Sequence, residues 1–166
     1  ATVKLNIELK KLIEHVDSVT FCLSKGLACP IGSVICSTQE FINQARRMRK
    51  VLGGGMRQAG IIASAGLVAF KNMNNQISLD HDNAQKLANG INQIDDLSID
   101  YDKVKTNILY FKLKSNSISS EQFLSEMNAK GVLFFEVSPN KYRLVTHYGI
   151  TKEDIDYTLN TFKKVL

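Results

Sequence analysis

The sequence predicts an α/β protein whose second half forms a small α+β unit. Hydrophobic residues make up 44% of the 166 residues and charged residues 22%, which is enough apolar content to bury a core. Along the chain, apolar residues at helical spacing give way to short continuous or alternating runs that are typical of strands. No apolar run approaches the ~20 residues of a membrane helix, so we expect a soluble protein.

A helix and two short strands are expected near the start. Residues 7–15 carry apolar side chains at helical spacing. Residues 19–23 form a compact apolar run, most simply a buried strand. A turn with Pro30 separates this run from a second short strand at 32–36, so a hairpin is predicted.

Three helices are expected next. Ser37 or Thr38 caps a helix over residues 40–51. Residues 60–70 are small and apolar all round, and a helix of that kind is usually buried between other elements. Residues 79–92 open with acids and then repeat apolar side chains at helical spacing.

The second half has the rhythm of an α+β unit. Residues 95–102 are acidic and loop-like. The expected order is then strand, helix, strand, turn, strand and helix, over residues 107–113, 119–130, 132–137, 139–140, 142–145 and 151–166. We place the boundary inside or just after the helix at 79–92, which gives two domains, 1–92 and 93–166.

The three cysteines indicate a reducing compartment. Cys22, Cys29 and Cys36 cannot all pair with one another, and none belongs to a C-x-x-C motif. Because no histidine lies nearby to complete a metal site, we expect no metal there. Buried or free thiols in a cytoplasmic protein are the expectation.

The net charge of +5 is concentrated in one segment. Residues 41–60 contain no acid and five cations, Arg46, Arg47, Arg49, Lys50 and Arg57. A nucleic-acid-binding surface usually spreads its charge over a face or tail, so this cluster favours a single anionic contact, such as a phosphate. The alternative is a solvated helix face.

Lys25 stands directly after the first predicted strand. Burial at a strand end would disfavour the charged amine, and a neutral amine can attack an aldehyde, as a Schiff-base lysine must. The alternative is an ordinary surface lysine.

Two further features could contact anions. In the loop that runs from Gly53 to Arg57, three glycines would let backbone amides approach a phosphate; the alternative is a flexible helix connection. Arg143 interrupts an apolar strand, and its planar fork suits a carboxylate. The alternative for Arg143 is a side chain that reaches solvent from the polar face.

Four motifs in order resemble the threonine aldolases, pyridoxal-phosphate enzymes of the aspartate-aminotransferase fold that are grouped with the β-eliminating lyases. The motifs lie at residues 17–33, 46–60, 106–108 and 143–147. One departure lies beside Lys25, where relatives usually read Gly-Leu-Gly-Ala-Pro and this chain has Ala28 and Cys29 before Pro30.

The resemblance covers only the later part of the family's chain. It implies an α/β fold in which the end of a PLP-dependent-transferase large domain, residues 1–92 with a linking helix, is followed by a small α+β C-terminal domain, residues 93–166. The family's cofactor-binding aspartate, ring-stacking histidine, phosphate-binding turn and a second carboxylate-binding arginine have no counterpart here. The chain is therefore expected to be a C-terminal fragment, inactive by itself.

The resemblance implies that the whole enzyme cleaves L-threonine or allo-threonine to glycine and acetaldehyde. It implies that Lys25 binds pyridoxal 5'-phosphate covalently and that Arg143 holds the substrate carboxylate. It also implies that Lys50 and Arg57 lie near the cofactor phosphate or the active-site entrance, contributed by the same or a neighbouring subunit. It also implies a dimer or tetramer of identical chains, with no nucleic-acid or membrane partner. The alternatives are a non-catalytic remnant of the family and a basic phosphate-binding module.

Overall fold

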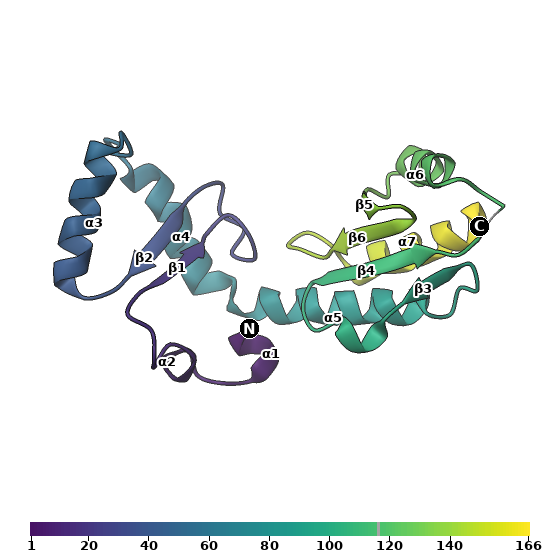
Figure 1. Ribbon diagram of the computed structural model, residues 1–166, viewed down its shortest axis with the longest axis horizontal. Coiled ribbons are helices and arrows are strands. Elements are labelled where there is room, and N and C mark those ends of the chain that lie inside the picture. Colours follow the sequence, from purple (N-terminus) through teal and green to yellow (C-terminus); the bar gives the residue numbers. More distant parts are fainter. Residues whose placement is uncertain (116) are drawn as a thin grey trace. The chain divides into compact units, whose positions relative to one another are not determined.

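The computed structural model describes residues 1–115 and 117–166 (Figure 1). The chain forms two compact units, Ala1–Ile77 and Ser78–Leu166, each described below by itself. The units divide ahead of the boundary placed from the sequence after residue 92. The assignment of residues 1–92 and 93–166 to a large and a small domain stays a prediction.

The first unit contains a two-stranded antiparallel hairpin and several helices. Its elements are α1 (Thr2–Leu5), α2 (Leu9–Leu12), β1 (Val19–Cys22), β2 (Ser33–Cys36), α3 (Gln39–Val51), α4 (Gly60–Asn72) and the start of α5 (Asn74–Ile91). In the hairpin, Val19 lies opposite Cys36, which confirms the predicted strand pair. The helix expected over 7–15 is wrong in extent, since only one turn forms there.

Thr38 is the cap of α3. Its hydroxyl oxygen accepts a hydrogen bond from the backbone N–H of Phe41 at 3.4 Å. Ser37, the other candidate, donates to the carbonyl of Asp17 at 2.7 Å and so ties the hairpin's exit to its entry. The predicted helix and one of its two candidate caps are confirmed.

The apolar core of the first unit is small. Its buried hydrophobic residues are Leu23, Cys29 and Ala69. The expectation that residues 60–70 form a buried helix is half wrong: α4 forms, but Ile61 is 81% exposed and Leu67 73%. A helix that is apolar all round needs neighbours on every side, and the described part of this unit covers only the side that carries Gly66 and Ala69.

The second unit is a four-stranded antiparallel sheet covered by helices on one face. Its elements after α5 are β3 (Leu97–Ile99), the 3-10 turn η1 (Tyr101–Lys103), β4 (Ile108–Leu113), α6 (Ser120–Ala129), β5 (Phe135–Ser138), β6 (Lys141–Val145) and α7 (Lys152–Val165), and the strand order is β3-β4-β6-β5. The predicted order of elements is confirmed. The expected loop at 95–102 is wrong, because Leu97 pairs with Leu113 and adds a short edge strand.

The core of the second unit lies between the sheet and helices α5, α6 and α7. Alternate residues of β4 and β6, such as Phe111 and Tyr142, are buried against it. Helix α5 adds Ala84, Leu87, Ala88 and Ile91 to the same core. The remaining β4 and β6 residues lie on the opposite face, the open face, which carries Ile108, Tyr110, Lys112, Lys141, Arg143 and Val145.

Candidate active site

Lys25 lies in a tight turn between β1 and β2. The backbone N–H of Ala28 donates to the carbonyl of Lys25 at 2.8 Å. Two more backbone hydrogen bonds close the ends of the loop. The N–H of Leu23 donates to the carbonyl of Gly32 at 2.9 Å, and the N–H of Cys29 donates to the carbonyl of Leu23 at 3.1 Å. The backbone that carries Lys25 is therefore held by its own hydrogen bonds.

The loop is also anchored on helix α4. Leu23 and Cys29 are buried, and the Cys29 thiol donates to the carbonyl of Ala65 at 3.6 Å. A Cβ placed on Gly66 would lie 3.3 Å from Leu23 Cδ1, so this glycine lets the loop approach the helix closely. The anchored ends leave Lys25 itself exposed.

The predicted burial around Lys25 is wrong for the chain as described. Strand β1 alternates between half-buried and exposed residues, whereas a strand buried on both faces was expected. In the described residues the hairpin has no further strand beside it, and Lys25 is exposed. The position of Lys25 was predicted correctly; its surroundings were not.

Ala28 takes a backbone conformation that favours glycine. Its φ is +53°, in the left-handed region, where a Cβ costs roughly 1–2 kcal/mol. The threonine aldolases usually carry glycine at the matching position, so the departure seen in the sequence falls where the side chain is most costly. The neighbouring change, Cys29, is buried and packs with Leu23 and Ala69.

The glycine loop after α3 is a helix cap, not an amide cradle. Gly53 has a φ of +81°, and its N–H donates to the carbonyl of Lys50 at 3.1 Å. The N–H of Gly54 donates to the carbonyl of Arg49 at 2.8 Å. Two of the three glycine amides are thus already used, and the C-terminal end of a helix dipole repels anions, so the structure favours the alternative, a helix connection.

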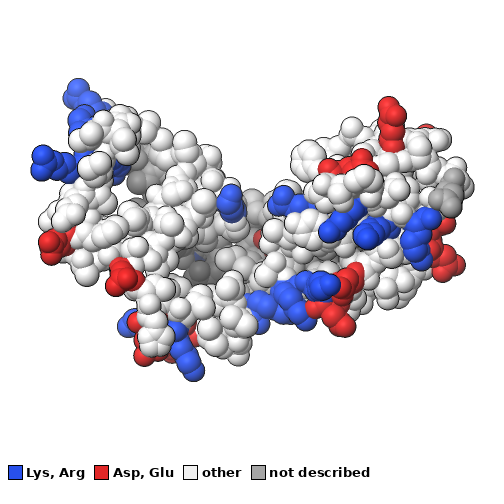
Figure 2. Space-filling view, viewed as in Figure 1, with Lys and Arg blue, Asp and Glu red and all other residues white. Residues whose placement is uncertain are grey.

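Lys50 and Arg57 are exposed, as are Arg46, Arg47 and Arg49. Figure 2 shows cations gathered at the tip of the first unit, over the end of α3 (Figure 1). Among the residues described, none of these five cations forms an ion pair. Any phosphate contact at this cluster would therefore be made by side chains.

Arg57 and the Lys25 loop lie at different places along α4. Arg57 precedes the first residue of α4, whereas the Lys25 loop packs farther along that helix, at Ala65 and Gly66. A Cβ on Gly26 would lie 3.8 Å from Ile77, at the start of α5. Arg57 thus lies before α4 begins, whereas the Lys25 loop packs against the middle of that helix.

Arg143 lies on the open face of the second unit. It is half-buried, opposite Tyr110 of β4 and Phe135 of β5 in the strand register. Its Nε is buried and has no hydrogen-bond partner among the described residues. An unsatisfied buried donor costs about 1–3 kcal/mol, so this guanidinium is suited to an acceptor supplied by a ligand. The strand expected to carry Arg143 is confirmed as β6, and its role as a carboxylate clamp stays a prediction.

The motifs at residues 106–108 and 143–147 lie side by side in the structure. The side-chain amide of Asn107 donates to the carbonyl of Thr146 at 2.8 Å, and the N–H of Thr146 donates to the carbonyl of Asn107 at 3.0 Å. These bonds extend the pairing of β4 and β6 beyond Ile108 and Val145. They hold the strand that displays Arg143.

Sequence reasoning missed Tyr110 and Phe135, the aromatic neighbours of Arg143. The alternation in residues 107–113 places Tyr110 on the polar face, but only the register shows which residue of another strand lies opposite. No signal in the sequence could have supplied that register.

His147 and the cysteines have no metal-binding arrangement. In the part of the chain that the structure describes, no group of three or more His, Cys, Asp or Glu residues could hold a metal ion. His147 is exposed, and its Nδ1 lies 2.8 Å from the carbonyl of Tyr148. All three cysteines are free thiols.

Across the described residues, no helix is both long and apolar enough to span a membrane.

Comparison with known proteins decides the family. The family model for beta-eliminating lyases matches residues 1–114. The chain belongs to the beta-eliminating lyase family.

This beta-eliminating lyase resembles curated threonine aldolases over its whole length. It is 36% identical to low-specificity L-threonine aldolase 1 of Arabidopsis thaliana, covering 100% of the chain and 47% of that relative. It is 38% identical to the low-specificity L-threonine aldolase of Escherichia coli K12, covering 93% of the chain and 44% of the relative. The chain spans about half the length of the curated relatives it matches.

The fold of this chain is similar to that of solved structures. A solved structure from Exiguobacterium sp. 255-15, a candidate aromatic amino acid beta-eliminating lyase/threonine aldolase, superposes with a TM-score of 0.80 at 13% identity. The match covers 99% of the chain and 49% of that structure. The α/β fold expected from the sequence is confirmed.

Proposed function

We propose that this beta-eliminating lyase is part of a pyridoxal-phosphate-dependent threonine aldolase, which cleaves L-threonine or allo-threonine to glycine and acetaldehyde. The observation that carries the proposal is the match of the entire chain to a low-specificity L-threonine aldolase at 36% identity. When bound, pyridoxal phosphate withdraws electrons from the α-carbon of an amino acid, which is the chemistry that this cleavage needs.

The residues present fit that cofactor and substrate. Lys25 lies on a loop fixed by backbone bonds and by two buried residues, so the backbone would hold its amine in one place for covalent attachment to an aldehyde. Arg143 offers a buried Nε without a partner in the described chain, which suits a carboxylate. In this proposal Lys25 holds the cofactor, and Arg143 orients the amino acid so that the bond to be broken has the right geometry.

The cofactor phosphate is assigned to Lys50 and Arg57. Both side chains are exposed, and the Lys50 side chain lies across Gly55, where a Cβ would come within 2.8 Å of Lys50 Cδ. Because Arg57 precedes α4 and the Lys25 loop packs against the middle of that helix, we propose that Arg57 serves the Lys25 of a neighbouring subunit in a homo-oligomer.

The first test is Lys25→Ala in the full-length protein. The variant should lose the absorbance band of the bound cofactor and its turnover, while it keeps the far-ultraviolet circular dichroism of the wild type. Lys4→Ala, a change of an exposed lysine in α1, is the matched control and should change neither. Retained absorbance with normal turnover would refute the assignment of Lys25.

Subunit mixing tests the shared site. Lys25→Ala and Arg57→Ala proteins are each expected to be inactive. If the site is shared, unfolding and refolding the two together restores part of the activity, because some mixed oligomers contain one intact site. Recovery no greater than that of either variant refolded alone would place both residues in the same subunit's site or remove Arg57 from it.

A further inference from the structure

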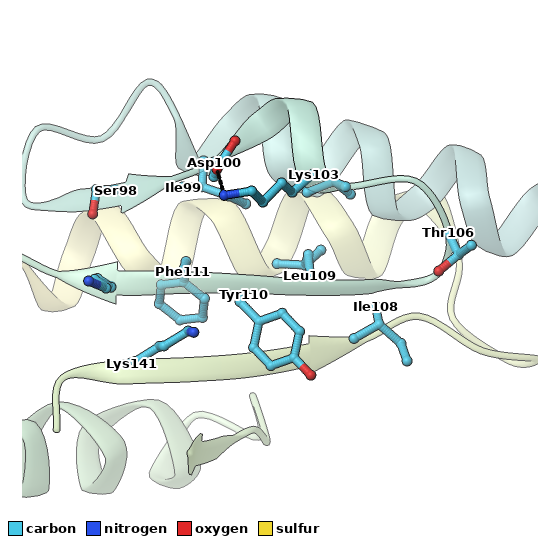
Figure 3. Close-up of a pocket in the computed structure, with 12 residues that line it drawn as sticks. Ser98, Ile99, Asp100, Lys103, Thr106, Ile108, Leu109, Tyr110, Phe111 and Lys141 are labelled. Atoms are coloured by element: carbon cyan, nitrogen blue, oxygen red, sulfur yellow. Dashed lines mark ion pairs between the residues drawn. The ribbon is translucent and has the colours of Figure 1, made fainter. Parts of the chain in front are cut away.

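The sheet of the second unit has a pocket of about 750 Å³ at one edge (Figure 3). Strand β3 pairs with β4 only from Leu97 to Ile99, opposite Leu113 to Phe111. The chain then leaves the sheet through η1, so no strand of the described residues lies beside the outer edge of β4 from Ile108 to Tyr110. The pocket lies in this gap, and Lys141 of β6 completes its lining.

The lining carries an excess of positive charge. Its lysines are Lys103, Lys112 and Lys141, and its only acid is Asp100. Asp100 is already paired with Lys103, with 2.6 Å between Oδ2 and Nζ (Figure 3). This hydrogen bond and the charge of Asp100 raise the pKa of Lys103. No acid in the lining remains for the other two lysines.

Lys112 and Lys141 face each other across the strands. They are register partners in the antiparallel pair of β4 and β6, so their side chains project from the same face. Like charges directly opposite in a sheet are destabilising. Neither lysine forms an ion pair within the described residues, and a bound anion would remove the repulsion between them.

The position of one of these amines is defined by an aromatic ring. Lys141 Nζ lies 5.2 Å from the centre of the Tyr110 ring (Figure 3). Ser98, the register partner of Lys112 on β3, and Thr106 add hydroxyl groups to the lining. The pocket therefore combines two unpaired cations, hydroxyl groups and an aromatic surface.

We propose that this pocket binds a small organic dianion, with its acidic groups at Lys112 and Lys141 and its carbon skeleton against Tyr110. The volume lies in the range of pockets that enclose organic molecules, so a bare inorganic ion would leave it mostly unfilled. The lining includes none of Lys25, Lys50, Arg57 and Arg143. The site is thus additional to the proposed aldolase chemistry and does not rest on it.

The test measures how fast single lysines react in the full-length, cofactor-loaded protein. Trace acetic anhydride acetylates exposed amines, and peptide mass spectrometry reads each lysine separately. Succinate probes a dicarboxylate and glycerol 2-phosphate probes a phosphomonoester, with succinamide and sodium chloride as neutral and ionic-strength controls. At a probe concentration about four times the dissociation constant, acetylation of Lys112 and Lys141 should slow about fivefold and saturate.

Lys105 is the matched control lysine. It lies in the same connection between β3 and β4, is exposed, and does not line the pocket. Its acetylation should stay unchanged with either probe. Whichever probe protects at the lower concentration identifies the acidic group that the site prefers.

Two variants complete the design. Lys112→Gln should remove the probe's protection of Lys141, and it should not destabilise the fold, because it also removes the repulsion between the two lysines. Lys105→Gln should keep the protection. Lys25→Ala should also keep it, so failure of the aldolase assignment and failure of this proposal are distinguishable.

Three outcomes would overturn the proposal. The first is equal slowing at Lys105, Lys112 and Lys141, which would be general screening of charge. The second is no saturable slowing by either probe. The third is a low reactivity of Lys112 and Lys141 before any probe is added, which would show that another part of the full-length protein covers the pocket.

Discussion

Asn107 and Thr146 exchange two hydrogen bonds at the end of the β4–β6 pair. The amide of Asn107 donates to the carbonyl of Thr146 at 2.8 Å, and the N–H of Thr146 donates back to the carbonyl of Asn107 at 3.0 Å. The hydroxyl of Thr146 also donates to the carbonyl of Asp80 in α5, at 2.6 Å. One residue pair thus joins two strands and a helix, three residues along the chain from Arg143.

We expect Thr146→Val to lower the free energy of unfolding by about 1 kcal/mol, because a buried hydrogen bond between elements is lost at nearly constant side-chain volume. Urea denaturation monitored by circular dichroism measures the change. Thr161→Val is the matched control: Thr161 is also buried, but its hydroxyl donates to Tyr157 within the same helix. An equal loss in both variants would show that the bond to Asp80 has no special role.

Arg143→Ala should weaken the binding of amino acids roughly 10- to 100-fold in the full-length protein, since a charged hydrogen-bonding group contributes about 1.5–3 kcal/mol. Cofactor affinity should change little. Titration with glycine, followed through the absorbance of the bound cofactor, measures the affinity for amino acids. Equilibrium dialysis measures the affinity for the cofactor. Arg143→Lys should remain weak because lysine lacks the planar fork. Equal effects on both affinities would contradict the role as a carboxylate clamp.

Ala28→Gly should stabilise the protein. The left-handed φ of +53° costs an alanine roughly 1–2 kcal/mol, and glycine removes this strain. About half of the gain in stability is offset, because glycine has more conformational freedom in the unfolded chain. Thermal unfolding should show a higher midpoint. Ala45→Gly, inside α3, is the opposite control and should destabilise by about 1 kcal/mol. A lower midpoint for Ala28→Gly would mean that the left-handed conformation is not the one populated.

The start of α7 should make stability depend on pH. The backbone and hydroxyl of Thr151 donate to the Asp154 carboxylate at 2.8 and 3.0 Å, and these bonds lower the pKa of Asp154 from its ordinary value of 3.8. These bonds stabilise the fold fully when the pH is above the pKa of Asp154 in the unfolded chain. The stabilisation is lost as the pH falls through the lower pKa of Asp154 in the folded protein. Asp154→Asn should therefore flatten the loss of stability as the pH falls from about 5 towards 2.

Thr151 and Asp154 form a capping box, in which each side chain accepts a hydrogen bond from the backbone N–H of the other, and Thr151→Ala tests the part of Thr151. Loss of an N-cap side chain should lower the free energy of unfolding at neutral pH by about 1 kcal/mol. Thr158→Ala, whose hydroxyl bonds within α7, is the control and should have a smaller effect. Identical pH profiles for wild type and Asp154→Asn would contradict the assignment of the carboxylate.

Helix caps and strand alternation could be read from the sequence because both depend on neighbouring residues. Thr38 caps its helix as expected, and residues 108–113 alternate between half-buried or exposed and buried positions. The short strand β3 was missed because three residues carry too little pattern, and its existence depends on pairing with β4.

The candidate site was predicted unevenly for the same reason. Lys25 and Arg143 were found because an amine after a strand and a cation within a strand are visible locally. The two interpretations of the glycine loop could not be separated from the sequence, because the bonds of the Gly53 and Gly54 amides to carbonyls of α3 are a property of the folded helix end. The exposure of α4 likewise could not be read from its composition, which shows only that the helix needs apolar neighbours.

By itself the sequence determined the order of the elements, the hairpin that carries Lys25, the strand that carries Arg143 and the family these motifs resemble. The tertiary structure alone decided which residues lie opposite Arg143, that its Nε lacks a partner in the described chain, and that Lys112 and Lys141 face each other beside a pocket. The physical reason is that local preferences act over a few neighbouring residues, whereas register and burial depend on which distant segments meet.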